Sequence, residues 1–167
     1  AIDECYLIQE FFDFPSLQDM IDEYHDNDTT FSEEETLKIM NSIAEILDVL
    51  QTQYNPPVIH RDIKPSNILY DKLQNKAMLI DFGAVSAPAK KTDGSTIAGT
   101  QGFMAPEQML GECTTQSDFY GLGATALYML TGTSPVNMSY DKANPFLLKF
   151  DEIFKIVSSQ NNNTNYQ

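Results

Sequence analysis

The sequence is poor in basic residues. Ten Lys and Arg stand against 24 Asp and Glu, which gives a formal net charge of −14. This charge argues against a nucleic-acid-binding surface, which needs a basic footprint, whereas a basic protein partner would be attracted. Long apolar runs are also missing, because none approaches the roughly 18 residues of a membrane span, and no basic-then-apolar leader opens the chain. We therefore expect a soluble cytoplasmic protein with no membrane span and no nucleic-acid partner.

Cysteine and arginine are scarce as well. Cys5 and Cys113 fit no metal-binding spacing, and two thiols in 167 residues indicate reduced cysteines, not a disulfide framework. Arg61 is the only arginine in the sequence. Hydrophobic residues nevertheless make up 42% of the chain, which is enough for one packed domain or a large piece of one.

The N-terminal half alternates between strand and helix signals. Residues 5–11 carry alternating aromatic and β-branched side chains and predict a strand. Ser16 with Asp19 three positions later predicts the start of a short helix over LQDMIDEYHD. Ser32 and Glu35 form the pattern of a second capping box. The longer helix that follows should end near residue 53, before two prolines, and its apolar face is predicted to consist of Leu37, Met40, Ile43, Ala44, Leu47 and Leu50.

The C-terminal half begins with a predicted hairpin, in which residues 68–70 pair with residues 77–80. Residues 84–104 form a long loop, a type that is usually functional or disordered. Ser117 is a candidate cap for a helix that is apolar nearly all round and should be buried, with close packing around Gly121 and Gly123.

Residues 140–157 are predicted to be helical. The polar residues 158–167 are predicted to be a disordered tail. The predicted fold is thus mainly α with short β-hairpins.

Three short motifs occur in a fixed order. HRDIKPSN occupies residues 60–67, DFG residues 81–83 and APE residues 105–107. A predicted strand pair separates the first two motifs, and the long loop separates the last two. Together they resemble the C-terminal lobe of a eukaryotic-type serine/threonine protein kinase. The stretches GTQGFMAPEQ and SDFYGLGATALYMLTGTSP are similar to sequences of bacterial, particularly cyanobacterial, members of that family.

The resemblance implies roles for the charged motif residues. Asp62 would accept or orient the proton of the substrate hydroxyl, and Lys64 would offer its charge to the γ-phosphate of ATP. Thr100 would bond to both of these residues. Asn67 and Asp81 would hold Mg²⁺ against the phosphates. The alternative for Asp62 and Asn67 is simple turn capping, because both residue types bond to nearby backbone groups.

The same resemblance implies an ATP-binding surface. Backbone groups of Glu10 and Phe12 would bond to the adenine ring, Gln9 would stand at the gatekeeper position, and Leu69 would line the floor of the pocket. The alternative is that residues 5–11 are a plain core strand. A serine- or threonine-bearing protein is the implied substrate.

Other residues receive structural or regulatory expectations from the resemblance. His60 and Phe82 should be packing residues behind the site, and Gly83 should permit the backbone turn that aims Asp81. Asp118 should anchor the backbone of the catalytic loop. The candidate phosphorylation sites, whose phosphates could pair with Arg61, are Thr92, Ser95 and Thr96.

The sequence also departs from the family. It starts at the expected hinge strand, so we expect a partial kinase domain over residues 1–157 that lacks the N-lobe and the final helices. Glu107 has no second arginine to pair with, and should be more exposed than usual or find its partner outside the chain. Two accounts remain open: a piece of an active kinase, or a truncated, non-catalytic kinase-like scaffold. In either case residues 1–167 alone should show little catalysis.

Overall fold

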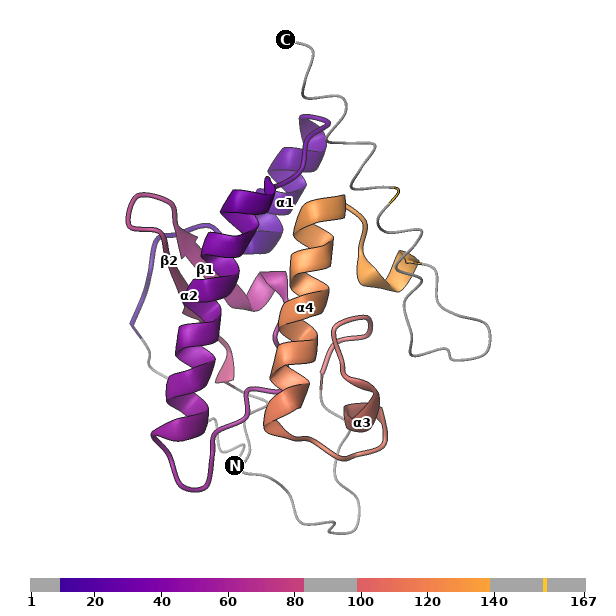
Figure 1. Ribbon diagram of the computed structural model, residues 1–167. Helices are drawn as coiled ribbons and strands as arrows, with labels where there is room; N and C mark the ends of the chain where they lie inside the picture. The colour runs from indigo at the N-terminus through magenta and orange to yellow at the C-terminus, as the bar shows by residue number, and fades with distance from the viewer. Residues whose placement is uncertain (1–9, 83–98, 139–154, 156–167) are drawn as a thin grey trace, which may run out of the picture.

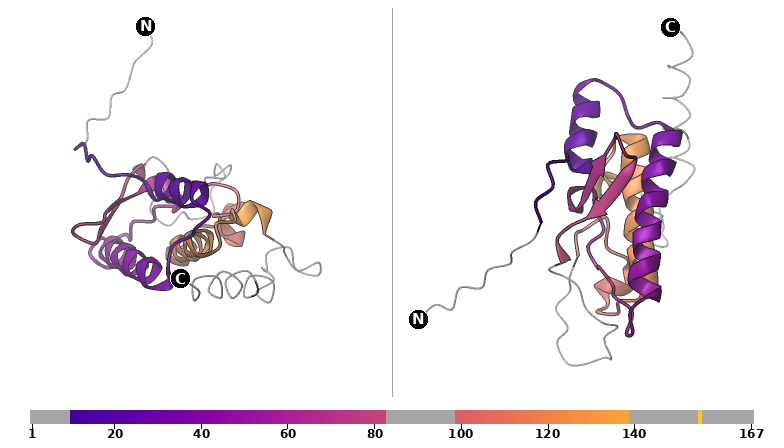
Figure 2. Two further views of the ribbon diagram at one scale, coloured as in Figure 1. Left: turned by 90° about the horizontal axis from the view of Figure 1, so that it is seen from above. Right: turned by 90° about the vertical axis from the view of Figure 1, so that its left-hand side faces the viewer.

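The computed structural model describes residues 10–82, 99–138 and 155. Within these ranges the fold is mainly α-helical with a single two-stranded hairpin, in agreement with the predicted class. Two long helices, α2 (Glu33–Thr52) and α4 (Thr115–Thr131), lie side by side (Figure 1). The hairpin packs against α2, as the second view in Figure 2 shows. The shorter elements are α1 (Leu17–Asp26), η1 (Pro65–Asn67), β1 (Ile68–Asp71), β2 (Lys76–Leu79), α3 (Pro106–Met109) and η3 (Pro135–Asn137).

Several predictions fall on residues that the structure does not describe. Residues 10 and 11 have no regular secondary structure, and the rest of the predicted strand at 5–11 lies outside the described residues. The same holds for most of the long loop at 84–104, for the predicted helix at 140–157 apart from residue 155, and for the tail at 158–167. None of the helices in the described ranges combines the length and hydrophobicity that crossing a membrane requires.

Helix α1 begins with the predicted capping box. The Ser16 hydroxyl accepts a hydrogen bond from the Asp19 amide at 3.1 Å, and the Asp19 carboxylate accepts one from the Ser16 amide at 2.9 Å. The side-chain hydrogen bond from Ser16, followed by its backbone hydrogen bond, lowers the pKa of Asp19. The box therefore fixes where the chain turns into α1 and which helix face, with Leu17 and Met20, enters the core.

Helix α2 buries most of its predicted apolar face: Ile43 and Leu47 lie in the core, and Met40, Ala44 and Leu50 pack against it. The prediction was wrong only for Leu37 and did not include Ile39. Ile39, Ile43 and Leu47, spaced by four residues, are fully buried, whereas Leu37 is 62% exposed. Leu37 lies two positions before Ile39 and so points away from that face, because two residues turn an α-helix by more than half a revolution.

The N-terminus of α2 forms only part of the predicted capping interaction. The Ser32 hydroxyl accepts from the Glu35 amide at 3.1 Å. The Glu35 carboxylate accepts from the Tyr24 hydroxyl at 3.1 Å and lies 3.6 Å from the Lys72 ammonium. It therefore ties the start of α2 to α1 and to the hairpin turn.

The hairpin forms as predicted, with Ile68 opposite Leu79 and Asp71 opposite Lys76 in an antiparallel pair. A two-stranded hairpin is marginal by itself and needs further packing. The Tyr70 amide donates to the carbonyl of Pro15 at 3.1 Å, so the segment leading into α1 covers the free edge of β1. This contact, with the bridge between Ser16 and Leu69, places residues 15 and 16 beside the strand that follows the HRDIKPSN motif.

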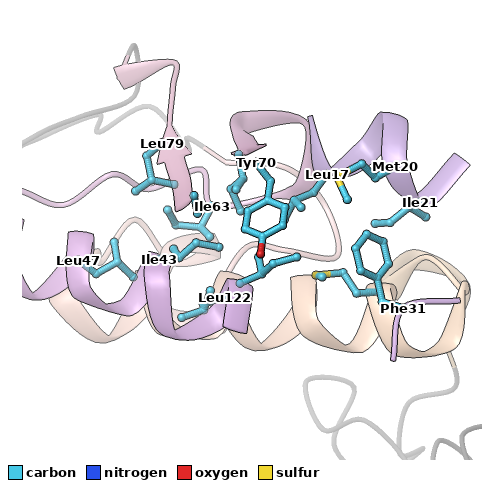
Figure 3. Close-up of a cluster of buried hydrophobic side chains, with 14 residues drawn as sticks. Leu17, Met20, Ile21, Phe31, Ile43, Leu47, Ile63, Tyr70, Leu79 and Leu122 are labelled. Carbon is cyan, nitrogen blue, oxygen red and sulfur yellow. The ribbon is translucent and has the colours of Figure 1, made fainter. Parts of the chain in front are cut away.

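The hydrophobic core joins all these elements (Figure 3). Side chains of α1, α2, the hairpin and α4 meet around Ile63, which is 2% exposed and belongs to the HRDIKPSN loop. Burying a side chain of this size is worth about 1.5–3 kcal/mol. The core thus holds the motif loop by a residue that stands between Asp62 and Lys64.

Helix α4 differs in detail from its prediction. Its N-cap is Thr114, and Ser117 instead stands inside the first turn, where its hydroxyl accepts from the Thr114 amide at 3.1 Å. Phe119 is 45% exposed, so the helix is not buried all round. A Cβ at Gly121 would lie 2.8 Å from the carbonyl oxygen of Ile63, as expected for close packing, but a Cβ at Gly123 would meet nothing within 4 Å.

These two glycines provide a matched pair with opposite expected effects. Gly121→Ala should destabilise the protein by about 1–3 kcal/mol, because its methyl group would push the backbone of Ile63 out of place. Gly123→Ala should stabilise it by up to about 1 kcal/mol, because it adds only helix propensity. Urea unfolding of both variants measures the difference. Stabilisation by both would show that α4 does not press on the loop.

Candidate active site

The loop over residues 60–67 is held by the side chains that it buries. His60 is fully buried, Ile63 is 2% exposed and Asn67 is 5% exposed. The His60 ring also contacts the ring of Phe82 edge-on, at 4.9 Å between centroids, which agrees with a packing role for His60. Phe82 itself is 44% exposed, so it is not the buried packing residue that was expected. The intervening Asp62 and Lys64 keep part of their side chains at the surface, at 15% and 22% exposure.

Four predicted site residues meet in one hydrogen-bonded cluster. The Asp62 carboxylate lies 2.8 Å from the Lys64 ammonium and accepts a 2.7 Å hydrogen bond from the Thr100 hydroxyl. The Lys64 ammonium donates to the Thr100 hydroxyl at 2.8 Å. The Asn67 amide nitrogen donates to the Asp62 carboxylate at 3.1 Å and to the Asp62 carbonyl at 2.9 Å. Thr100 is thereby brought to Lys64, 36 positions away in the sequence, and to Asp62, 38 positions away. Capping of a local turn does not explain contacts over such distances.

The cluster keeps Asp62 ionised. Burial by itself raises the pKa of Asp62, but hydrogen bonds from Lys64, Thr100 and Asn67 and the charge of Lys64 outweigh it and hold the pKa below its usual value. A lowered carboxyl pKa contributes stability that is present above the ordinary pKa and is lost as the pH falls through the lowered one. At neutral pH the carboxylate is therefore an acceptor whose position is fixed.

Asp118, in the first turn of α4, anchors the backbone of the loop, as predicted. Its carboxylate accepts from the His60 amide at 2.9 Å and from the Arg61 amide at 2.8 Å, and the residue is 1% exposed. Burial raises the pKa of Asp118, and the two backbone hydrogen bonds oppose this without cancelling it. Arg61 itself has φ = 72°, a left-handed conformation that costs a non-glycine residue of order 1–3 kcal/mol and is common at functional sites.

Asp81 follows the end of β2, where the chain returns to the loop. The Ile80 amide donates to the Asn67 carbonyl at 3.0 Å, and the Ile80 carbonyl lies 3.1 Å from the His60 ring nitrogen. Asp81 is exposed and has φ = 61°, the second left-handed residue beside the loop. In the part of the chain that the structure describes, no group of three or more His, Cys, Asp or Glu is arranged to hold a metal.

The structure describes only some of the residues predicted for ATP binding. Leu69 is half-buried and forms a bridge with Ser16, so the segment after the predicted hinge lies beside it. Phe12 is half-buried and Glu10 is exposed. Gln9 and Gly83 lie outside the described residues. The same is true of the three candidate phosphorylation sites, Thr92, Ser95 and Thr96.

The APE motif has contacts that the sequence did not reveal. Glu107 is half-buried, and its carboxylate accepts a 2.7 Å hydrogen bond from the Ser117 hydroxyl, a neutral partner within the chain that was not predicted. Gln108, which was not predicted as a site residue, is 5% exposed and donates from its amide to the Arg61 carbonyl at 2.9 Å. The only signal for it in the sequence is a glutamine at the third position of a short helix.

Comparison with known proteins agrees with this geometry. Residues 2–167 match the protein kinase domain family. The chain is 36% identical over 146 residues to serine/threonine-protein kinase D of Synechocystis sp., an alignment that covers 83% of this chain and 27% of that protein. It is 37% identical over 142 residues to serine/threonine-protein kinase B of Synechocystis sp., with 79% and 24% covered.

A third relative comes from another bacterial group. A probable serine/threonine-protein kinase of Bifidobacterium longum is 38% identical over 133 residues, which cover 78% of this chain and 16% of that protein. The chain therefore belongs to the protein kinase family, in its eukaryotic-type serine/threonine branch. Its alignments span only 16–27% of the length of these three relatives.

Proposed function

We propose that the protein transfers the γ-phosphate of ATP to serine or threonine hydroxyls of a protein substrate, with Mg²⁺ as cofactor. The observation that carries this proposal is the cluster around the Asp62 carboxylate, which receives Lys64 at 2.8 Å, Thr100 at 2.7 Å and Asn67 at 3.1 Å. Phosphoryl transfer needs an aimed hydroxyl and a positive charge beside the moving phosphoryl group, and Asp62 and Lys64 supply these.

The contacts of the Asp62 carboxylate, together with its lowered pKa, support a particular part in the reaction. A weakly basic carboxylate does not strip the proton from a free hydroxyl, so Asp62 first aligns the substrate hydroxyl and takes its proton as the bond to phosphorus forms. Lys64 contacts the same carboxylate and would offer its charge to the γ-phosphate of bound ATP. Thr100 bonds to both side chains and so holds them at a fixed separation.

The donor set fits Mg²⁺, which prefers hard oxygen ligands. The Asn67 amide nitrogen is turned toward Asp62, so its oxygen is the atom that would hold the ion. The Asp81 carboxylate, two residues beyond the end of β2, would supply the second ligand. The ion would neutralise charge on the ATP phosphates, and Glu10, Phe12 and Leu69 would border the adenine ring.

Phosphate transfer by the full-length protein tests the proposal. Incubation with radiolabelled ATP, Mg²⁺ and basic peptides that carry Ser, Thr or Tyr as the sole hydroxyl acceptor should label the Ser and Thr peptides and not the Tyr peptide. Basic peptides suit the net charge of −14, because opposite charge favours encounter. Chelation of Mg²⁺ should stop the transfer. Labelling of no acceptor under any of these conditions, with ATP bound, would favour the scaffold alternative instead.

A further inference from the structure

Gln108 connects two parts of the site with one side chain. It stands at the third position of α3 and is 5% exposed. Its amide oxygen accepts a 2.9 Å hydrogen bond from the Ala105 amide, which caps α3. Its amide nitrogen donates at 2.9 Å to the carbonyl of Arg61, 47 residues earlier in the chain. The two ends of the same amide group therefore have separate tasks, one in α3 and one in the loop that carries Asp62.

The Arg61 carbonyl belongs to the peptide group that leads into Asp62. On the other side of Arg61, the amide is fixed by the Asp118 carboxylate at 2.8 Å. With φ = 72°, Arg61 would relax toward ordinary backbone angles if either peptide group were released. Such a rotation would move the Asp62 side chain, because the Cα of Asp62 lies in the rotating peptide plane and carries the Cβ with it.

The space around the Arg61 carbonyl is also tightly limited. Gly99 has φ = 132°, and a Cβ there would lie 3.2 Å from the Arg61 carbonyl oxygen. The start of the segment 99–108 thus lies next to this oxygen, where only a residue without a Cβ fits freely, and its end, at Gln108, donates to it. The position of the Arg61 carbonyl therefore depends on where both ends of this segment lie, and the same segment contributes Thr100.

We propose that Gln108 is a positioning residue for phosphoryl transfer, which holds the peptide between Arg61 and Asp62 so that the Asp62 carboxylate stays aligned. This inference rests on the proposed kinase function for its kinetic consequences. Its structural content, the hold on the Arg61 carbonyl, can be tested separately.

Gln108→Glu separates the two tasks of the side chain. A glutamate keeps an oxygen that accepts from the Ala105 amide, so the cap of α3 remains. When ionised it has no donor for the Arg61 carbonyl and repels that oxygen; when protonated its hydroxyl can donate again. Assayed in the full-length protein, kcat should fall roughly 10- to 100-fold at pH 8 with KM for ATP little changed, as expected for a misaligned reacting group.

The pH profile is the readout that a merely structural role would not change. The ratio of variant to wild-type kcat should rise as the pH is lowered, because protonation of the new carboxyl restores a donor. Gln116→Glu is the matched control, since it makes the same change on an exposed residue of α4 and should have a ratio near one at every pH. A ratio for Gln108→Glu that is near one, or low and independent of pH, would overturn the inference.

A spectroscopic measurement removes the dependence on activity. Arg61 precedes Asp62 and is the only arginine in the sequence, so labelling with ¹³C-carbonyl arginine and ¹⁵N-aspartate selects their shared peptide group by NMR. In Gln108→Met this carbonyl signal should move, whereas in Gln116→Met it should stay in place. A moved signal in a protein without kinase activity would support the hold and refute the proposed function. An unmoved signal in an active, folded Gln108→Met protein would refute the hold alone.

Discussion

Asp62→Asn is expected to lower kcat for phosphate transfer by about 10²- to 10⁴-fold, the usual contribution of a positioned proton acceptor. An asparagine fills the same space but cannot take a proton from the substrate hydroxyl. In the aspartate, one carboxylate oxygen lies 2.7 Å from the Thr100 hydroxyl and the other 2.8 Å from the Lys64 ammonium. In the asparagine, an amide nitrogen would replace one of these two oxygens and lose that contact. Steady-state kinetics of the full-length protein with Mg²⁺-ATP measures the loss.

The same experiment distinguishes catalysis from folding. Asp62 is partly exposed and its backbone is held by its neighbours, so the variant should keep a wild-type circular dichroism spectrum and bind ATP with an affinity within a fewfold of wild type. Asp48→Asn, an identical change on an exposed position of α2, should leave kcat unaltered. An Asp62→Asn protein with kcat within threefold of wild type would remove Asp62 from the reaction.

Asp118→Ala is expected to be the most destabilising of the substitutions considered. It leaves the buried amides of His60 and Arg61 without an acceptor, and each unsatisfied donor costs about 1–3 kcal/mol, so the two together cost about 2–6 kcal/mol. Removing the carboxyl group relieves part of this cost, because burial disfavours its charged form. Urea unfolding at pH 7 measures the net change, and Asp48→Ala is the exposed control.

The sign of the pH dependence gives a further check on Asp118. A carboxyl group with a raised pKa in the folded state favours folding most at low pH, and this contribution is lost as the pH rises from the ordinary pKa through the raised one. The difference in unfolding free energy between wild type and Asp118→Ala should therefore be larger near pH 4 than at pH 7. Asp62, whose pKa is lowered, contributes in the opposite direction. An equal difference at both pH values would mean that the Asp118 carboxylate is not penalised by burial.

The features that were predicted well depend on local patterns or on adjacent motif residues. The capping box of α1 involves residues three apart, and the hairpin pairs neighbouring strands, so short-range chemistry determines both. The meeting of Asp62 with Thr100 was expected only from the resemblance to kinases, because nothing local in the sequence connects positions 38 apart. The family likeness thus supplied the long-range contact, and the structure supplied its geometry.

The features that were missed depend on which surface a neighbour covers. Leu37 and Ile39 are equally apolar, and only the packing of α2 against the hairpin and α4 decides that Ile39 is buried. Gly121 and Gly123 are the same residue in one helix, yet only the first faces another backbone. Gln108 acts through a side-chain contact to a distant carbonyl, which leaves no periodic signal in the sequence.

The anchoring of His60 and Arg61 by Asp118 has a consequence for biosynthesis. The acceptor lies 58 and 57 residues after the amides it binds, and the amide of Gln108 also comes later than the carbonyl it holds. During translation the HRD segment therefore leaves the ribosome well before the groups that order it, and it cannot adopt its left-handed turn until α4 has emerged and docked. Pulse-labelled amide exchange on stalled nascent chains would detect this delay as protection at position 61 that begins only with the longer chains.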